Sequence, residues 1–120
     1  KIYDEADVGV SALGLYKINN EHVSCLKNGE YMAKGLPVIY TGDKEDVPNN
    51  CKEFFLLTPN MPTPININDV ISFYNELVKK YGDSLNEIIR NEAIKYYDIS
   101  VSMIPVIDII KKKNIVEVNK

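Results

Sequence analysis

The chain has 120 residues, of which 45% are hydrophobic and 26% charged, and its formal net charge is −3. This composition is typical of one globular domain with a modest core. The net negative charge provides no positive electrostatic potential that would attract nucleic acid. No apolar run approaches the roughly 20 residues that a membrane-spanning helix needs. The two cysteines form no disulfide framework of the secreted kind. We therefore expect a cytoplasmic protein without a nucleic-acid partner.

The first predicted elements are a strand, a loop and a helix. Residues 7–13 are small and apolar without alternation, as in a strand covered on both faces of a parallel sheet. A polar loop at 14–23 follows. Ser24 then suits a helix N-cap, and Gly35 suits the left-handed residue past the C-terminus. On this helix we expect a packing stripe of Cys25, Leu26, Gly29, Met32 and Ala33, and an outward stripe of Lys27, Glu30, Tyr31 and Lys34.

Two more strands are predicted after this helix. Residues 37–41 resemble the first strand in composition, and residues 52–58 supply a third. The segment 41–50 is rich in turn formers, and the prolines within 59–64 exclude regular structure there. The pattern therefore predicts an α/β fold with a partial Rossmann-like parallel sheet of about three strands and flanking helices. Such a partial sheet has an exposed edge that could support self-association.

The pattern is helical from residue 68 onward. Asn68 is expected to cap a helix that stops at Gly82, and Ser84 with Glu87 is expected to form a capping box for the next helix. Ser102 is expected to cap a third helix, whose early proline is tolerated in the first turn.

The end of the chain is less regular. Residues 114–120 could be a short strand or disordered. We therefore divide a single partial domain, 1–120, into a β/α part at 1–64, C-terminal helices at 65–113 and a tail at 114–120. Because Lys1 is no initiator methionine, we expect a piece of a longer protein.

The charges of the first predicted helix favour a bound anion. Lys27 lies in the first turn, where the helix dipole is positive, and it precedes Glu30 by three residues, the less favourable order for an ion pair. An anion at the helix N-terminus would explain this, because free N–H groups and the ammonium would converge on it. Gly29 costs about 1 kcal/mol relative to alanine inside a helix, which suggests a close backbone approach. The alternative is a solvated Lys/Glu face over an ordinary core stripe.

Four pieces of the sequence combine into a larger pattern: Tyr3, ADVGVS at 6–11, SCLK at 24–27 and EYMAKGLPVI at 30–39. Together they resemble the C-terminal, donor-binding half of GT-B glycosyltransferases, in particular the large retaining family often called group 1 or family 4. The resemblance implies that Glu30 binds the ribose hydroxyls of a nucleotide-sugar. It also implies that the turn formed by Ser24, Cys25, Leu26 and Lys27 receives the diphosphate.

The pattern departs from that family at one position. The family places an acidic residue that contacts the donor sugar upstream of the later glutamate, with seven residues between the two, and counting back from Glu30 in this way reaches His22, with Glu21 one step further. Either Glu21 fills the catalytic role through a one-residue insertion, or His22 substitutes for it, or neither does; we favour Glu21. Tyr16, in the same loop, is a candidate stacking residue. A lone histidine gives no reason to assign a metal.

The resemblance implies a hexosyltransferase that moves a sugar from a nucleotide-diphosphate sugar to an acceptor, with no cofactor and no metal. The missing N-terminal domain of the same enzyme would bind the acceptor, so this chain alone is expected to be inactive. Polysaccharide biosynthesis at the inner membrane face is the implied setting. The alternative is a non-catalytic nucleotide-binding or regulatory α/β module.

Overall fold

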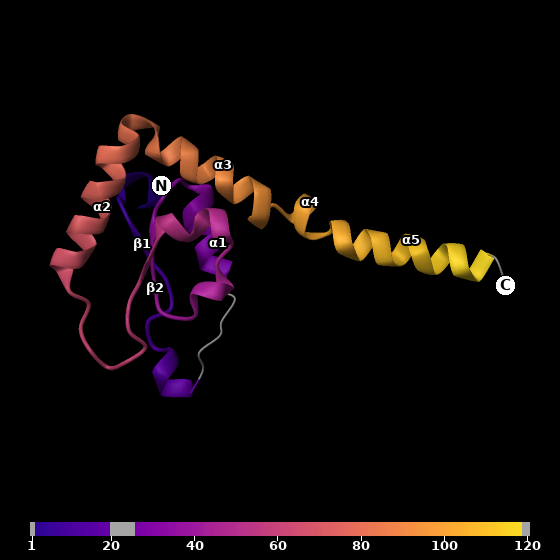
Figure 1. Ribbon diagram of the computed structural model, residues 1–120, viewed down its shortest axis with the longest axis horizontal. Helices are drawn as coiled ribbons and strands as arrows, with labels where there is room; N and C mark the ends of the chain where they lie inside the picture. The colour runs from indigo at the N-terminus through magenta and orange to yellow at the C-terminus, as the bar shows by residue number, and fades with distance from the viewer. Residues whose placement is uncertain (1, 20–25, 119–120) are drawn as a thin grey trace.

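The computed structural model describes residues 2–19 and 26–118, and it shows a mixed α/β fold (Figure 1). One parallel sheet has the strand order β1-β2-β3, with β1 at Gly9–Val10, β2 at Val38–Tyr40 and β3 at Phe55–Leu57. The three strands lie within the segments predicted for them. Each is shorter than predicted.

Most of the described chain is helical. The α-helices are α1 at Leu26–Ala33, α2 at Ile67–Tyr81, α3 at Leu85–Tyr97, α4 at Ile99–Ser102 and α5 at Ile104–Val118. Short 3₁₀ helices are η1 at Ile2–Glu5, η2 at Leu15–Ile18, η3 at Lys44–Asp46, η4 at Asn49–Phe54 and η5 at Gly82–Ser84.

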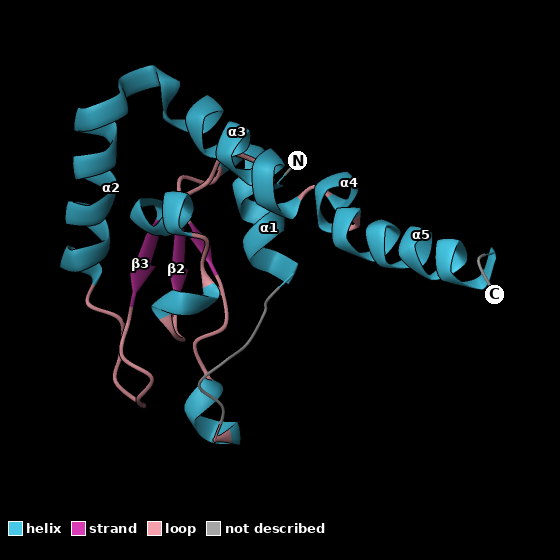
Figure 2. Ribbon diagram, turned by 45° about the vertical axis from the view of Figure 1, so that its right-hand side comes forward, coloured by secondary structure: helices cyan, strands magenta, loops and turns pink. Residues whose placement is uncertain are grey.

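The core lies where α1, α2, α3 and η4 meet the sheet. Its buried side chains are Met32, Val38, Tyr40, Val47, Cys51, Phe54, Leu77, Leu85, Ile89 and Ala93. α3 passes the end of the sheet at which the strands begin (Figure 2). The opposite end, where the strands finish, therefore remains outside this helical packing.

The first predicted helix ends as expected. Gly35 has a φ of +79°, the left-handed conformation that follows a helix C-terminus. A Cβ at this residue would overlap the backbone of Asn86 at the start of α3. Glycine is therefore required here both by the backbone conformation and by the close approach of a neighbouring helix.

The predicted stripes of this helix are partly wrong. Met32 is buried, as expected, but Ala33 is exposed and Tyr31 is half-buried. Asn28, which we had placed on neither stripe, is 5% exposed. The reason is the direction of α1, which presents positions 28 and 32, one turn apart, to the interior.

The segment predicted as the third strand begins as a helix. Residues 49–54 form η4, and only Phe55–Leu57 pair with β2. Cys51 and Phe54 are both buried. A 3₁₀ helix places residues three apart on the same side, so this conformation buries both side chains. In a strand, residues three apart would point to opposite faces, and only one of the two could face the same core.

The predicted cap of α2 is wrong by two residues, whereas the predicted cap of α3 is at the expected residue but lacks its hydrogen bond. Asn66, not Asn68, caps α2, and its side chain accepts a hydrogen bond from the amide of Asn68 at 3.0 Å. Ser84 makes no capping hydrogen bond, because η5 already gives it a helical backbone that leads directly into α3. The predicted capping box with Glu87 is therefore not formed.

The tail also differs from both expectations. Ser102 ends α4 instead of capping a helix, and the Asp98 side chain caps α4 by accepting from the amide of Ser100 at 2.8 Å. α5 begins at Ile104 and continues to Val118, so described residues 114–118 are neither strand nor disordered. We call residues 2–19 and 26–97 the body and α4 with α5 the arm, which projects from the body in Figure 1.

Candidate functional site

The carboxyl ends of the strands form one edge of the sheet. Pairing continues beyond the strands, since the amide of Thr41 donates to the Ala12 carbonyl at 3.2 Å, and the amide of Thr58 to the Tyr40 carbonyl at 2.9 Å. The hydroxyls of Thr41 and Thr58 lie 2.7 Å apart and share a hydrogen bond. Open α/β sheets bind ligands at this edge, so the candidate site is built from the residues around it.

α1 is fixed across β1 by a single aromatic ring. A Cβ at Gly9 would overlap the ring of Tyr31, so glycine lets the helix approach the strand. The Tyr31 hydroxyl donates to the carbonyl of Val10 at 3.1 Å. These contacts determine which residues of α1 lie beside the carboxyl end of β1.

Two buried side-chain oxygens near this edge lack a hydrogen-bond partner. Ser11 follows β1 and is 7% exposed, and Asn28 lies in the first turn of α1 and is 5% exposed. The Ser11 Oγ and the Asn28 Oδ1 are both unsatisfied within the described residues. α1 runs antiparallel to β1, and Tyr31 on α1 contacts Gly9 on β1. Asn28 precedes Tyr31 and Ser11 follows Gly9, so both residues lie on the same side of this contact. Both oxygens therefore lie toward the carboxyl edge.

An unsatisfied buried oxygen of this kind costs about 1–3 kcal/mol, and most buried polar atoms in proteins have partners. Two such oxygens on adjacent elements are unfulfilled hydrogen-bonding atoms beside the edge where open α/β sheets bind ligands. The sequence analysis missed both residues. The position of Asn28 four residues before Met32 was the signal that it faces inward.

Lys27 and Glu30 are both exposed on the outer side of α1. Within residues 2–19 and 26–118, neither side chain has an ion pair or hydrogen bond, and the two side chains do not pair with each other. Both charges are therefore available to a ligand that reaches the first turns of α1. The exposure of Lys27 and Glu30 also fits the alternative, a charged helix face that contacts only solvent.

The other predicted site residues are only partly described. Tyr16 is half-buried on η2, next to the buried Leu15. Leu26 is the first residue of α1. The proposed catalytic Glu21, and with it His22, Ser24 and Cys25, lie outside the described residues. Of the predicted site residues that the structure describes, Leu26, Lys27 and Glu30 lie together on α1, and Tyr16 lies apart from them on η2.

Gly29 lies on the packing side of α1, as predicted, and the close approach expected at this residue is made by a side chain and not by backbone. A Cβ at this residue would lie 3.2 Å from the Tyr97 ring of α3. The close approach is therefore made by an aromatic side chain of the body, and Gly29 gives no support for a ligand. Burial of Tyr97 raises its pKa to about 12.

A second group of titratable side chains surrounds Cys51 on the side of the body formed by η4 and α3. Lys95 donates to Glu92 at 2.9 Å, which lowers the pKa of Glu92, and the Asn50 amide also donates to that carboxylate. Burial, with the nearby charge of Glu92, raises the pKa of Cys51 to about 11. The thiol is therefore neutral at physiological pH and unsuited to nucleophilic chemistry.

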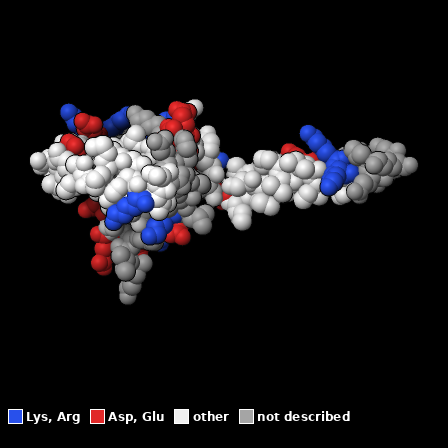
Figure 3. Space-filling model, turned by 90° about the horizontal axis from the view of Figure 1, so that it is seen from below, with Lys and Arg blue, Asp and Glu red and all other residues white. Residues whose placement is uncertain are grey.

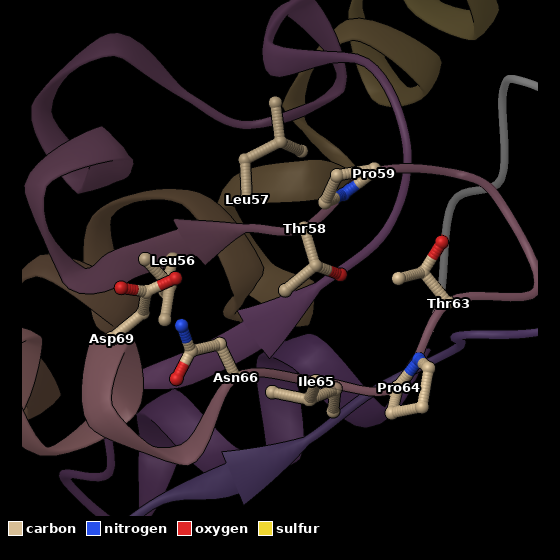
Figure 4. A pocket seen from close by; sticks show the side chains of 9 residues that line it. All are labelled: Leu56, Leu57, Thr58, Pro59, Thr63, Pro64, Ile65, Asn66 and Asp69. Carbon is tan, nitrogen blue, oxygen red and sulfur yellow. The ribbon is translucent and has the colours of Figure 1, made fainter.

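A small cavity lies beside β3, between its carboxyl end and the start of α2 (Figure 4). Its volume is about 210 Å³, less than the ~300–1,000 Å³ of typical ligand pockets. The lining residues are Leu56, Leu57, Thr58, Pro59, Thr63, Pro64, Ile65, Asn66 and Asp69. None of the predicted site residues contributes to it. Asp69 lies in the first turn of α2, where the helix dipole already stabilises its charge.

Seen from the carboxyl edge, the body presents both basic and acidic side chains, and the arm is nearly uncharged until the lysines close to its end (Figure 3). Across the described ranges, no group of three or more His, Cys, Asp or Glu residues could hold a metal ion. In the same part of the chain, no helix combines the length and the apolar character that crossing a membrane requires.

Comparison with other proteins adds no relative: no family model matches the chain, and no curated protein or solved structure is significantly similar to it.

Proposed function

We propose that this chain carries part of the donor site of a retaining GT-B glycosyltransferase and binds the nucleoside diphosphate of a nucleotide-sugar. The observation that carries the proposal is the pair of unsatisfied buried oxygens of Ser11 and Asn28, next to the carboxyl edge of the sheet. Ligands of open α/β sheets occupy this edge, and hydroxyl or amide donors of a ligand would satisfy both oxygens.

The helix α1 supplies the remaining polar groups in this proposal. Its first turn offers backbone N–H groups to a diphosphate, and the exposed ammonium of Lys27 adds a positive charge beside them. Glu30 follows one turn later and is equally exposed, which suits a carboxylate that accepts hydrogen bonds from vicinal ribose hydroxyls. These are the roles that the family resemblance implies for the two residues.

The chemistry would be the departure of the nucleoside diphosphate from the donor sugar. Charge that develops on the diphosphate would be stabilised by the α1 N–H groups and Lys27, without a required metal. Glu21, or His22 in its place, would contact the sugar. The acceptor would bind to another domain of the same enzyme, in the cytoplasm and peripherally at the inner membrane face.

A nucleotide titration tests the binding step on the chain itself. We expect weak binding of at least one of UDP, GDP and ADP, followed by NMR chemical-shift changes on α1. Glu30→Ala should weaken it about 10- to 100-fold, as expected for a lost charge-assisted hydrogen bond. Glu76→Ala, an equally exposed glutamate on α2, is the matched control and should bind as the wild type does. Absence of binding to all three nucleotides would contradict the proposal.

Ser11→Ala separates a binding role from a structural one. Removal of an unsatisfied buried hydroxyl should leave the free energy of unfolding unchanged or increase it, because nothing in the protein bonds to that oxygen. The same change should weaken nucleotide binding if the hydroxyl contacts the ligand. A variant that loses stability and keeps full affinity would show that Ser11 serves the fold alone.

The alternative function is a non-catalytic nucleotide-binding module, because the binding residues alone do not require sugar transfer. An assay of sugar transfer by the longer protein distinguishes the two. Nucleotide binding to this chain without any transfer by the longer protein would favour the module.

A further inference from the structure

The cavity between β3 and the start of α2 is separate from the proposed donor site, since none of the donor residues lines it. Its volume of about 210 Å³ equals that of about seven water molecules, at ~30 Å³ each. A nucleotide or an organic cofactor has several times as many non-hydrogen atoms. The cavity therefore has the size of one amino-acid side chain or of a small molecule of similar size.

The N-terminus of α2 borders this cavity but offers little to an anion. The amides of Asp69 and Val70 donate to the Asn66 carbonyl at 3.1 and 3.3 Å, and the amide of Asn68 donates to the Asn66 side chain at 3.0 Å. An anion bound at a helix N-terminus needs free N–H groups. Because these N–H groups already have acceptors, the end of this helix is not an anion site.

The charged group of the cavity is the carboxylate of Asp69. Across residues 2–19 and 26–118, this side chain has neither an ion pair nor a hydrogen bond, and no lysine or arginine lines the cavity. Figure 4 shows the carboxylate at one end of the cavity, with Pro59 and Pro64 towards the other end. A ligand with a positively charged tip is the electrostatic complement of the Asp69 end.

The lining is otherwise mostly apolar, with Leu56, Leu57, Ile65 and the two prolines. A basic side chain lays its methylene groups against such a surface and keeps its charge at the tip. The planar guanidinium of arginine pairs with a carboxylate through two parallel hydrogen bonds, and it is more weakly hydrated than the ammonium of lysine. Arginine therefore suits both the carboxylate and the apolar wall.

The segment that forms the cavity wall also exposes apolar side chains to solvent. Leu57 is 38% exposed, Met61 is 55% exposed and Ile67 is 65% exposed. A free cation of the size of the cavity would leave these side chains in water. The residues that flank an arginine in a polypeptide would cover them, and exposed apolar surface beside a pocket is typical of protein contacts.

We propose that this cavity binds an arginine side chain of a partner polypeptide. The guanidinium pairs with the Asp69 carboxylate, and the stem lies against Ile65 and the prolines. Leu57, Met61 and Ile67 contact apolar residues on either side of that arginine. The bidentate pair fixes the orientation of the partner, and the apolar rim excludes water around this anchor.

A titration of the isotope-labelled full chain with the peptide acetyl-Leu-Arg-Leu-amide, followed by NMR, tests the proposal. We expect chemical-shift changes confined to residues 56–69 and a dissociation constant on the order of 1 mM, as for a single anchor side chain. The same peptide with citrulline, which has the shape of arginine without its charge, should bind at least about tenfold more weakly. No change around the cavity up to about 20 mM peptide would overturn the proposal. Equal binding of the citrulline peptide would do the same.

Asp69→Asn tests the carboxylate while keeping the shape of the side chain, and it should weaken binding of the arginine peptide about tenfold or more. Asp83→Asn is the matched control: it removes the same charge from an exposed side chain on η5, outside the cavity, and its affinity should match that of the wild type. The amide spectra of the free variants verify that both are folded. An equal loss in both variants, or no loss in Asp69→Asn, would contradict a specific carboxylate–guanidinium pair.

Further probes identify the source of the cation. Acetyl-Gly-Arg-Gly-amide lacks the apolar flanks and should bind more weakly than the leucine-flanked peptide, and butylguanidine, a free guanidinium on an apolar stem, should bind more weakly still. Acetyl-Leu-Lys-Leu-amide should also bind more weakly, because an ammonium makes no bidentate pair. If butylguanidine binds as tightly as the leucine-flanked peptide, the cavity takes a small free cation and a polypeptide partner is wrong. Equal or tighter binding of the lysine peptide would overturn the choice of arginine.

Discussion

The body and the arm contain helices of similar length that differ in what surrounds them. α3 has 13 residues and places Ile89 in the core with no exposed surface, whereas α5 has 15 residues and leaves Ile109 64% exposed. The buried apolar residues of α3, Leu85, Ile89 and Ala93, follow one side of the helix, whereas the apolar residues of α5 between 104 and 110 are exposed on all sides. The comparison teaches that apolar content alone does not bury a helix, and that the stability of the isolated chain resides in its body.

The largest expected effect comes from making the same substitution in both regions. Ile89→Ala should lower the free energy of unfolding by about 2–5 kcal/mol, because it leaves a cavity between α3 and the core. Ile107→Ala should change it by less than about 0.5 kcal/mol. Urea denaturation followed by circular dichroism measures both. Equal losses would mean that the arm is packed against the body in solution.

The next effect concerns the junction of α1 and α3. Gly35→Ala should lower the free energy of unfolding by roughly 2 kcal/mol or more, since alanine is strained at a φ of +79° and its Cβ overlaps the Asn86 backbone. Gly82→Ala is a control with a positive φ of 58° and no atom near the added Cβ. It should cost less, and a reversed order would contradict the close contact.

A smaller effect is a dependence on alkaline pH that belongs to the body. The pKa of Cys51 is raised from 9.0 to about 11 in the folded chain, so folding favours the neutral thiol. The stability from this group is complete below pH 9 and is lost as the pH rises towards 11. Cys51→Val should make the decline shallower over that interval. The ionisation of Tyr97, whose pKa is about 12, continues the decline at higher pH in both proteins.

The smallest expected effect on global stability lies at the start of the arm. Asp98→Ala removes the cap of α4 and should locally unwind this helix, at a cost of about 0.5–2 kcal/mol to the helix itself. The unfolding midpoint of the body should remain unchanged. Amide exchange at residues 99–102 should become faster, and that measurement separates local opening from global unfolding.

The sequence indicated the parallel sheet because its strands are short apolar runs separated by a helix and by turn formers. It did not indicate that residues 49–54 would be helical. The spacing of Cys51 and Phe54 suits a 3₁₀ helix, but apolar runs of this length fit either conformation. The cap of α2 moved by two residues, from Asn68 to Asn66, because the two asparagines at the start of this helix could serve equally well.

The candidate site was less predictable than the fold. The charges of Lys27 and Glu30 directed attention to α1, and both side chains are exposed as expected. The buried Ser11 and Asn28 depend on how Tyr31 seats the helix over Gly9, which is a tertiary contact that no local pattern contains. For the same reason the close approach expected at Gly29 could not be attributed to the ring of Tyr97 from the sequence alone.

The contact between α1 and α3 also has a consequence for the order of folding. α1 has only eight residues, too few to be stable as an isolated helix in water. Its last turn is held by Arg90, whose Nε donates to the Ala33 carbonyl at 3.1 Å. During synthesis on the ribosome, α1 therefore cannot become stable until α3 has emerged. We expect the first turn of α1 to be among the last parts of the body to form.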